Sequence, residues 1–326
     1  MKNSVLMTTY NGEAFILEQL DSIYNQTKKV NEVIICDDCS TDDTVVIVRN
    51  FIEQKSLTNW QVIVNKENKG WQKNFIEALS YVHGDVIFYS DQDDIWYPDK
   101  IAVMSNVMQR DKNVQCLAGR VHQIDAQGIA LGSQEISIVD RIAHTEEISN
   151  YKKFNVITFL GCTMCFTRKL ADIISEVNAT YFGHDAQTCR LAALLGGMYI
   201  MESAVLMYRM HENNTSGVVA GLSEGASDLE TRKKAIRANI QWLNSIINYS
   251  QKHDLLSQEK KIVVRDTIKM QEDRLSFLNN RKFGQYLSLV KYMKYYSGIG
   301  MYLGDFAYAY RINAKVAPIM AKMKKK

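Results

Sequence analysis

Short apolar runs and longer segments with helical spacing alternate along the first 90 residues of the chain. The apolar runs predict buried strands over residues 4–9, 32–36, 60–64 and 86–89. Between them, apolar side chains recur every three or four positions, which predicts helices over residues 13–26, 41–53 and 70–81. Because strands that alternate with helices form parallel sheets through crossover connections, we predict an α/β fold with a mostly parallel sheet and flanking helices. The loops after the strands then share one edge of the sheet, where open α/β sheets bind ligands.

The pattern is less regular in the middle of the chain. Apolar runs there predict strands over residues 117–124 and 156–167 and a strand pair over residues 198–201 and 205–208. Helical spacing predicts helices over residues 168–176 and 185–195.

Beyond residue 218 the pattern is helical. Long amphipathic segments cover residues 228–253, 257–279 and 283–297. We therefore predict two domains, an α/β domain over residues 1–217 and a helical C-terminal region over residues 218–326.

The composition is that of an ordinary globular protein, with 46% hydrophobic and 23% charged residues among 326. No secretory signal and no 18-residue apolar run is visible, so we expect no transmembrane helix. The six cysteines lack the spacing of a zinc site or a disulfide framework, which favours free thiols and a reducing, cytoplasmic compartment.

The charge is unevenly distributed along the chain. Residues 281–326 contain ten Lys and Arg residues against one acid, Asp305, while the whole chain has a net charge of +3. Eight tyrosine and phenylalanine residues are interleaved with these basic residues, which is typical of a helix that binds an anionic membrane surface. The alternative is a helical element that forms a homodimer or covers a core. A nucleic-acid partner is not expected, because no reading motif accompanies the basic residues.

Three carboxylates follow the strand at 86–89 within four positions, namely Asp91, Asp93 and Asp94. Like charges this close repel one another, and a divalent cation would relieve the repulsion. Carboxylate oxygens suit Mg²⁺ or Mn²⁺. The alternative is helix capping, in which Asp94 or Asp99 caps the helix that begins near Lys100.

Four features occur in a fixed order along the chain: residues 7–12, residues 37–44, residues 91–98, and His184-Asp185 with residues 208–214 behind it. Together they resemble family 2 glycosyltransferases of the GT-A fold over about residues 3–215. The SDQDD sequence at 90–94 and the YRxHxxN sequence at 208–214 are similar to those of bacterial rhamnosyltransferases, which build cell-wall and capsular polysaccharides.

The resemblance implies a nucleotide-sugar donor held by residues after the first three strands. Thr8, Tyr10 and Asp38 match the residues that hold a pyrimidine nucleoside. Asp38 can accept from the imide N–H of uracil or thymine, a proton that cytosine lacks, which favours a UDP- or dTDP-sugar. Asn68, Gly70 and Lys73 match a further base or ribose contact. The alternative for Asp37 and Asp38 is an Asx turn before the next helix. Cys39 stands where the family usually has glycine.

The resemblance also assigns the diphosphate end of the donor. Asp93 matches the metal-binding residue of the family, and Asp91 matches the residue near the ribose or donor sugar. Arg209, His211 and Asn214 match a diphosphate clamp, in which His211 is also a candidate metal ligand. Arginine suits this role because its forked donors fit a phosphate. The alternatives are a surface ion pair for Arg209 and a loop histidine for His211.

Asp185 is the candidate general base, because it begins a helical pattern and would take the proton of the acceptor hydroxyl. The alternative is a plain helix cap. Enzymes of this type invert configuration in one displacement, so a β-L-rhamnosyl donor would give an α-L-rhamnoside. Residues 161–164 match a small-residue turn that lies near the acceptor in the family.

We therefore predict an inverting, metal-dependent glycosyltransferase that is peripheral to the inner face of the plasma membrane. Its expected donor is dTDP-L-rhamnose, and its expected acceptor is a growing lipid-linked glycan. The alternatives are the same fold with a UDP-hexose donor, or a non-catalytic glycan-binding or scaffold protein. A nucleotidyltransferase is not expected, because only Gly12 follows the first strand where a Gly-rich phosphate loop would be needed.

Overall fold

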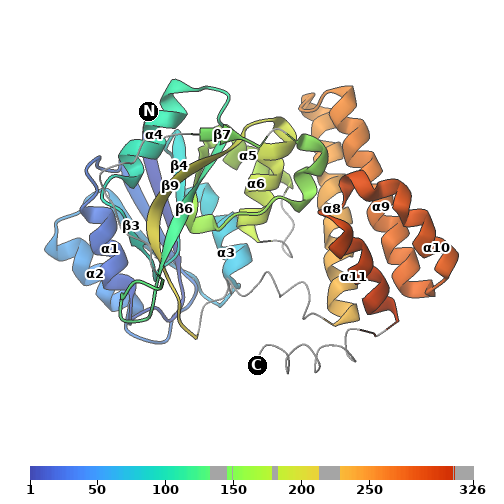
Figure 1. Ribbon diagram of the computed structural model, residues 1–326. Coiled ribbons are helices and arrows are strands. Elements are labelled where there is room, and N and C mark those ends of the chain that lie inside the picture. Colours follow the sequence, from blue (N-terminus) through green and yellow to red (C-terminus); the bar gives the residue numbers. More distant parts are fainter. Residues whose placement is uncertain (133–144, 149, 178–182, 213–227, 311, 313–326) are drawn as a thin grey trace. The chain divides into compact units, whose positions relative to one another are not determined.

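The structure is a computed structural model that describes residues 1–132, 145–148, 150–177, 183–212, 228–310 and 312 (Figure 1). The chain forms two compact units. The first contains Met1–Ser149 and Ile157–Asn214, and the second contains Asn150–Val156 and Thr215–Lys326. The predicted boundary at residues 217 and 218 lies outside the described residues.

The first unit begins with the predicted alternation of strands and helices. Its elements are β1 (Asn3–Thr9), α1 (Ile16–Tyr24), β2 (Glu32–Asp37), α2 (Thr44–Gln54), β3 (Trp60–Val64), α3 (Trp71–Ala78), the 3₁₀ turn η1 (Leu79–Tyr81) and β4 (Val86–Ser90). The four strands are parallel in the order β3-β2-β1-β4, with Thr9 opposite Asp37 and Met7 opposite Ser90. The loops after these strands therefore meet at one edge.

The sheet continues with strands of both directions. The elements are β5 (Ile95–Trp96), α4 (Lys100–Arg110), β6 (Cys116–Ile124), β7 (Thr145–Glu147), η3 (Gly161–Thr163), β8 (Met164–Thr167), α5 (Arg168–Val177), α6 (His184–Leu195) and β9 (Met198–Arg209). The order is β3-β2-β1-β4-β8-β6-β9-β5, and β7 pairs with β9. β8 is antiparallel to β4 and β6, whereas β6 and β9 are parallel. The mixed, mostly parallel sheet confirms the predicted fold class.

Two predicted strands of the middle region are wrong. Residues 156–167 form a strand only from Met164, because the preceding residues form the 3₁₀ turn η3. Residues 198–208 belong to one strand, β9, rather than to a hairpin. The residues between the two predicted segments lie at a shift of register between β6 and β9, where Ala118 pairs with Ile200 and Arg120 with Ala204.

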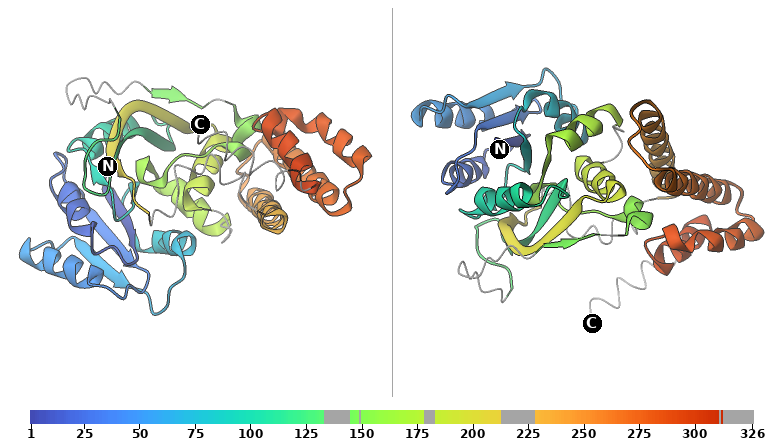
Figure 2. Two further views of the ribbon diagram at one scale, coloured as in Figure 1. Left: turned by 60° about the horizontal axis from the view of Figure 1, so that its bottom comes forward. Right: turned by 90° about the horizontal axis from the view of Figure 1, so that it is seen from above.

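Successive side chains along the strands point to opposite faces of the sheet, and a core forms on both faces. Val5, Met7, Val33 and Ile35 form one cluster with buried residues of α1, α2 and α4. Leu6 and the other intervening residues are buried as well, which is expected for a sheet with helices on both sides. In Figures 1 and 2, α1 and α2 lie on one side of the sheet and α3, α5 and α6 on the other.

The second unit is helical. Its elements are the 3₁₀ segment η2 (Tyr151–Val156), α8 (Leu229–His253), α9 (Gln258–Asn280), α10 (Phe283–Ser288), the 3₁₀ segment η5 (Leu289–Tyr295) and α11 (Ile299–Ala309). Asp228 and Ser257 cap α8 and α9 by accepting from backbone N–H groups of the first turn. The predicted helix over residues 283–297 is two segments instead of one, and α11 was not predicted.

The tyrosines of the C-terminal stretch are mostly core residues, which corrects the basis of the membrane prediction. Six of them are buried in the helical unit, namely Tyr286, Tyr292, Tyr295, Tyr296, Tyr302 and Tyr308. Tyr286 stacks on Tyr302 with ring centroids 4.3 Å apart. Asp305, the only acid in this stretch of sequence, is fully buried against Arg274 and Arg232. These aromatic residues therefore hold the unit together and are not presented to a membrane.

Within the described part of the chain, no helix combines the length and the apolar character needed to cross a membrane. All six cysteines are free thiols, as predicted.

Candidate active site

The loops after β1, β2, β3 and β4 are tied to one another at the carboxyl edge of the sheet. Asp38 N donates to Thr9 O at 2.8 Å, and Asn65 N donates to Asp37 O at 2.8 Å. Gln92 joins the loop after β4 to the loop after β1, because its side chain accepts from Tyr10 N at 2.8 Å and donates to Tyr10 O at 3.1 Å. The predicted site residues of these loops are therefore neighbours in space.

Asp38 organises the loop that follows β3. Its carboxylate accepts from Lys69 N at 2.9 Å, from Gly70 N at 2.8 Å and from Asn65 Nδ2 at 2.9 Å. A carboxylate has about four lone-pair sites, so one remains for a ligand donor. Asp38 is buried. The predicted imide contact would need that remaining site, while the bonds from Lys69 N and Gly70 N hold the loop in which Gly70 adopts φ 79° before α3.

The adjacent Asp37 has a purely internal role. It accepts from Thr9 Oγ1 at 2.8 Å and from Ser40 N at 2.8 Å, so the turn after β2 is an Asx-type turn made by Asp37 rather than by Asp38. Cys39 adopts φ 67° in this turn, the left-handed conformation that favours glycine.

The other predicted nucleoside contacts differ in their surroundings. Thr8 is buried, and Tyr10 is exposed at the same edge, where a ring could stack on a base. Asn68 Oδ1 accepts from Gly70 N at 3.0 Å, which places Asn68 in the Asp38 loop. Lys73 instead lies 3.6 Å from Glu77 on α3, in an exposed ion pair.

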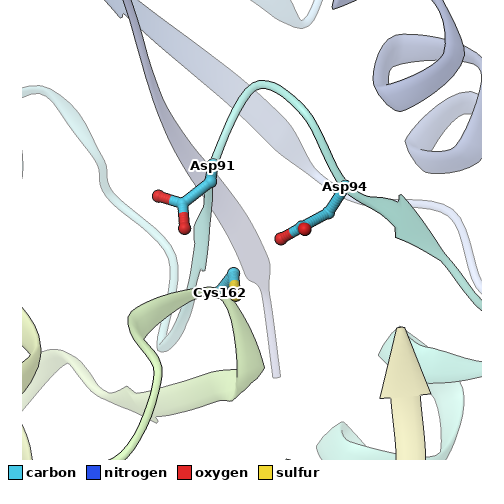
Figure 3. Close-up of side chains that lie close together, drawn as sticks. All are labelled: Asp91, Asp94 and Cys162. Atoms are coloured by element: carbon cyan, nitrogen blue, oxygen red, sulfur yellow. The ribbon is translucent and has the colours of Figure 1, made fainter. Parts of the chain in front are cut away.

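The acidic loop after β4 brings Asp91 and Asp94 together. They lie on the two arms of the loop, and Cys162 of η3 lies below them (Figure 3). One potential ligand atom from each of the three residues lies within 4.8 Å of the others. Asp94 is fully buried; its Oδ1 accepts from Arg209 N at 3.2 Å, and its Oδ2 has no partner.

This arrangement fits a hard divalent cation. Burial, followed by the charges of Asp93 and Asp185, raises the pKa of Asp91 to about 7. Burial and the charges of Asp93 and Asp91 raise the pKa of Asp94 well above its usual range. A cation between carboxylates removes this repulsion and gives the orphaned Asp94 oxygen a partner. Cys162 does not suit Mg²⁺ or Mn²⁺, because burial raises the pKa of its thiol and keeps it protonated.

Capping does not explain the acidic cluster. α4 has Asp99 at its N-cap position, but no side chain caps the helix there, and Asp94 faces the acidic loop instead. In the sequence, Asp94 was counted in the three-acid cluster that could bind a divalent cation, but the family resemblance assigned it no role, so it was not named as a metal ligand. Its place in that cluster, directly after a buried strand, is the signal that points to it.

Asp93 and His211, the two predicted metal ligands, lie together. His211 Nε2 is 2.8 Å from Asp93 Oδ2, and the imidazole packs on Phe15 with centroids 4.8 Å apart. The charge of Asp93 raises the pKa of both Asp91 and Asp94, so the pair lies near that cluster, and His211 occupies only one of the two Asp93 carboxylate oxygens. Asn214 lies outside the described residues.

Arg209 supports the acidic loop from behind. Its side chain is 1% exposed, and its donors reach Asp93 O at 2.8 Å, Ala126 O at 3.0 Å and Glu18 Oε2 at 2.6 Å. The guanidinium also lies over the Phe15 ring, 4.9 Å from its centroid. The ion pair with Glu18 is therefore not the surface pair considered above. A direct phosphate contact, as the family resemblance implies, requires some of these bonds to be exchanged.

Lys100 binds the turn at residues 161–163 and lies within electrostatic range of the acidic loop, a position that its place at a helix start does not predict. Lys100 is buried, its Nζ donates to Cys162 O at 2.6 Å, and it lies 3.5 Å from the centroid of Trp96. Burial lowers its pKa to about 7, against the opposing effect of the acids Asp94 and Asp91. It is thus a buried amine next to the acidic loop.

Asp185 lies in the first turn of α6, as predicted. Its Oδ1 accepts from Ala186 N at 2.6 Å. Burial raises its pKa, while the Ala186 N–H and the charge of Arg190 oppose the rise. The charge of Asp185 also contributes to the raised pKa of Asp91, so the two carboxylates are close enough to interact electrostatically.

Two glycines leave room for the residues of α6. A Cβ at Gly183 would collide with Asp185 Oδ1, so any side chain there displaces the candidate base. A Cβ at Gly161 would meet His184 Nε2. The His184 ring stacks on Phe75 with centroids 3.7 Å apart, and burial lowers its pKa to about 3. The turn at residues 161–163 is therefore fixed against α6 next to Asp185.

Comparison with known proteins identifies the class. The profile described as "Glycosyl transferase family 2" matches residues 4–173, which is more than half of the 326-residue chain. The chain therefore belongs to glycosyl transferase family 2 and is a glycosyltransferase. It is 32% identical over 223 residues to the "dTDP-rhamnosyl transferase RfbG" of Shigella flexneri, covering 65% of this chain and 73% of that protein.

Solved structures share the fold. The S. aureus TarS fragment 1–349 in complex with UDP-GlcNAc has a TM-score of 0.56 at 19% identity and covers 95% of this chain and 81% of that one. The Pyrobaculum calidifontis mannosyltransferase PcManGT in complex with GDP-Man and Mn²⁺ has a TM-score of 0.51 at 17% identity, covering 98% and 88%. These matches confirm the predicted GT-A fold.

Proposed function

We propose that this glycosyltransferase moves L-rhamnose from dTDP-L-rhamnose to a growing lipid-linked glycan in bacterial polysaccharide synthesis. The observation that supports the donor most directly is the 32% identity with a dTDP-rhamnosyl transferase over 223 residues. Asp38 adds a physical reason for a uracil or thymine nucleotide, because its free acceptor site matches the imide N–H.

In this proposal the nucleoside lies between the loops after β1, β2 and β3. Tyr10 provides the exposed ring and Thr8 and Asp38 provide polar contacts, with Asn68 and Gly70 nearby. Asp91, Asp93 and Asp94, with His211, are the residues that would hold Mg²⁺ or Mn²⁺. When bound, the cation would neutralise charge on the diphosphate leaving group. PcManGT was crystallised with Mn²⁺, which agrees with this choice.

The chemical step uses Asp185 as the general base. The acceptor hydroxyl gives its proton to the Asp185 carboxylate while its oxygen forms a bond to the anomeric carbon. The bond between that carbon and the diphosphate oxygen breaks, and the nucleoside diphosphate leaves. One such displacement inverts the configuration, so a β-linked donor gives an α-linked product. The turn at residues 161–163, held next to Asp185, is then the place for the acceptor.

The second candidate donor is a UDP-hexose. The matched TarS structure holds UDP-GlcNAc, and Asp38 cannot distinguish uracil from thymine by the imide contact alone. We further propose that the enzyme works at the cytoplasmic face of the plasma membrane, where a lipid-linked acceptor would be found.

A donor panel distinguishes these candidates. Purified protein is incubated with dTDP-rhamnose, dTDP-glucose, UDP-glucose and UDP-GlcNAc, with Mn²⁺, Mg²⁺ or a chelator, and release of the nucleoside diphosphate is measured. We expect metal-dependent release of dTDP from dTDP-rhamnose above all other donors. Preferential turnover of a UDP-hexose would retain the reaction type and reject rhamnose as the donor sugar.

A further inference from the structure

The helical unit presents an apolar surface that its own core does not use. Two stripes at helical spacing are exposed: Phe283, Leu287 and Val290 along α10 and η5, and Ile299 and Leu303 along α11. All five side chains are between 52% and 66% exposed. The stripes meet where the Phe283 ring contacts the Phe306 ring, with centroids 6.3 Å apart. We call these five residues the apolar face.

The exposed charged residues on the helices that carry this face are all basic. Among the described residues 281–310 and 312, the single acid is Asp305, and it is fully buried. Arg281 and Lys282 are exposed immediately before Phe283. Lys291 and Lys294 lie 3.4 Å and 3.9 Å from Asp273 and Asp266 of α9, and such exposed pairs are weak and easily exchanged.

The sequence that follows α11 strengthens this asymmetry. Residues 311–326 contain six Lys and Arg residues and no acid. An apolar face bordered by basic residues matches an anionic lipid surface, in which apolar side chains enter the acyl boundary and basic groups contact the headgroups. A second copy of the chain is the less suitable partner, because it would bring an equally basic surface to the contact.

We propose that the apolar face binds an anionic lipid bilayer and holds the enzyme at the membrane. This inference rests on the proposed function, since it supplies the reason for membrane contact: a lipid-linked acceptor lies at the same surface. The sequence-based prediction relied on tyrosines that are buried. The present proposal relies instead on five exposed aliphatic and aromatic residues.

Deleting residues 281–326 would be a poor test, because it removes Asp305 and leaves Arg274 and Arg232 buried without a carboxylate. Point substitutions in the full chain avoid this. The test variant is the double substitution Leu287→Ser and Leu303→Ser, which changes no charge and replaces no buried residue. The matched control is Ile262→Ser on α9, a residue of the same unit that is 56% exposed.

The measurement is co-sedimentation with vesicles of phosphatidylglycerol and phosphatidylcholine, compared with phosphatidylcholine alone. We expect the wild type and Ile262→Ser to bind the anionic vesicles and the double variant to bind at least roughly tenfold more weakly. Equal binding of the double variant and the wild type would overturn the proposal, as would a wild type that does not bind. The proposal would also be overturned if the wild type were a dimer, the double variant were a monomer, and both bound vesicles equally.

Donor hydrolysis in the absence of vesicles separates this inference from the proposed function. We expect all three proteins to release nucleoside diphosphate at the same rate, because the substitutions lie outside the catalytic unit. Loss of lipid binding with unchanged hydrolysis therefore supports the apolar face. If the wild type binds vesicles but hydrolyses no donor, the proposed donor is wrong and the proposed membrane contact is still supported.

Discussion

Replacing Asp185 with asparagine is expected to lower kcat by about a hundredfold to ten-thousandfold, the usual contribution of a general base. Asparagine keeps an oxygen that can accept from Ala186 N, as Asp185 Oδ1 does at 2.6 Å. The substitution therefore preserves the helix-terminal hydrogen bond and removes only the ability to take a proton. A residue that merely caps α6 would tolerate this change.

The measurement is glycosyl transfer to an acceptor under saturating donor, together with nucleotide binding by calorimetry. We expect nucleotide affinity to stay within about threefold of the wild type, because Asp185 accepts a proton from the acceptor and does not contact the nucleobase. Asp172→Asn, an exposed carboxylate on α5, serves as the control and should transfer sugar normally. Full activity of Asp185→Asn would show that another group is the base.

The pH dependence of kcat/KM gives an independent check on the same residue. A general base must be ionised, so activity rises as the pH increases through its pKa. Because burial raises the pKa of Asp185, this limb should lie above pH 4, the ordinary range of an aspartate. The limb should be absent from the residual activity of Asp185→Asn.

The largest effect on stability is expected from Asp305→Ala in the helical unit. The Asp305 carboxylate accepts from Arg274 Nε at 2.7 Å and Nη2 at 2.9 Å, and from Arg232 Nε at 3.0 Å and Nη2 at 2.9 Å. Arg274 is buried, and Arg232 is 10% exposed. Removing the carboxylate leaves both guanidinium groups without their counter-charge, which costs about 3–5 kcal/mol for a buried pair.

Urea unfolding followed by the fluorescence of Trp242, which is buried in this unit, measures the change. The exposed Glu272→Ala on α9 is the control and should change the free energy of unfolding by less than about 0.5 kcal/mol. A change below about 1 kcal/mol for Asp305→Ala would mean that the arginines find other partners.

Acid should weaken the same interaction. Burial acts to raise the pKa of Asp305, but the charges and hydrogen bonds of Arg274 and Arg232 outweigh it and hold the pKa below the usual range. A carboxyl with a lowered folded-state pKa stabilises the fold above its unfolded pKa of about 3.9. That contribution is lost as the pH falls through the folded-state pKa, so the wild type should lose stability below about pH 4 while Asp305→Ala changes less.

The spacing of apolar residues predicted the first half of the fold closely, because each helix and strand there is regular and is buried by its neighbours. β3 has its predicted bounds, and the loops after β1, β2 and β4 meet at one edge. It failed in residues 156–167 and 198–208, where an antiparallel strand and a register shift replace simple alternation. It also missed α11, in which Gly300 and Gly304 interrupt the helical pattern.

The site could be predicted where its residues are close together in sequence. Asp91, Asp93 and Asp94 stand directly after an apolar run and were singled out by that signal, whereas Asp38 was assigned by the family resemblance. Lys100 and Glu18 were not predicted, because their role depends on contacts between segments far apart in the chain. The C-terminal stretch shows the reverse error: its tyrosines were interpreted as membrane-facing, but six of them are buried in the helical unit.

The measurement that tests the central proposal most directly is calorimetric titration of dTDP and UDP into the wild type and Asp38→Ala, with Mn²⁺ and with a chelator. We expect micromolar binding that weakens at least tenfold when the metal is removed, since the cation offsets repulsion between the acidic loop and the diphosphate. Asp38→Ala should lose a similar amount, because it removes the base acceptor and releases the loop at Lys69 and Gly70. Binding that is unaffected by both the metal and Asp38 would contradict a nucleotide-diphosphate site at this edge of the sheet.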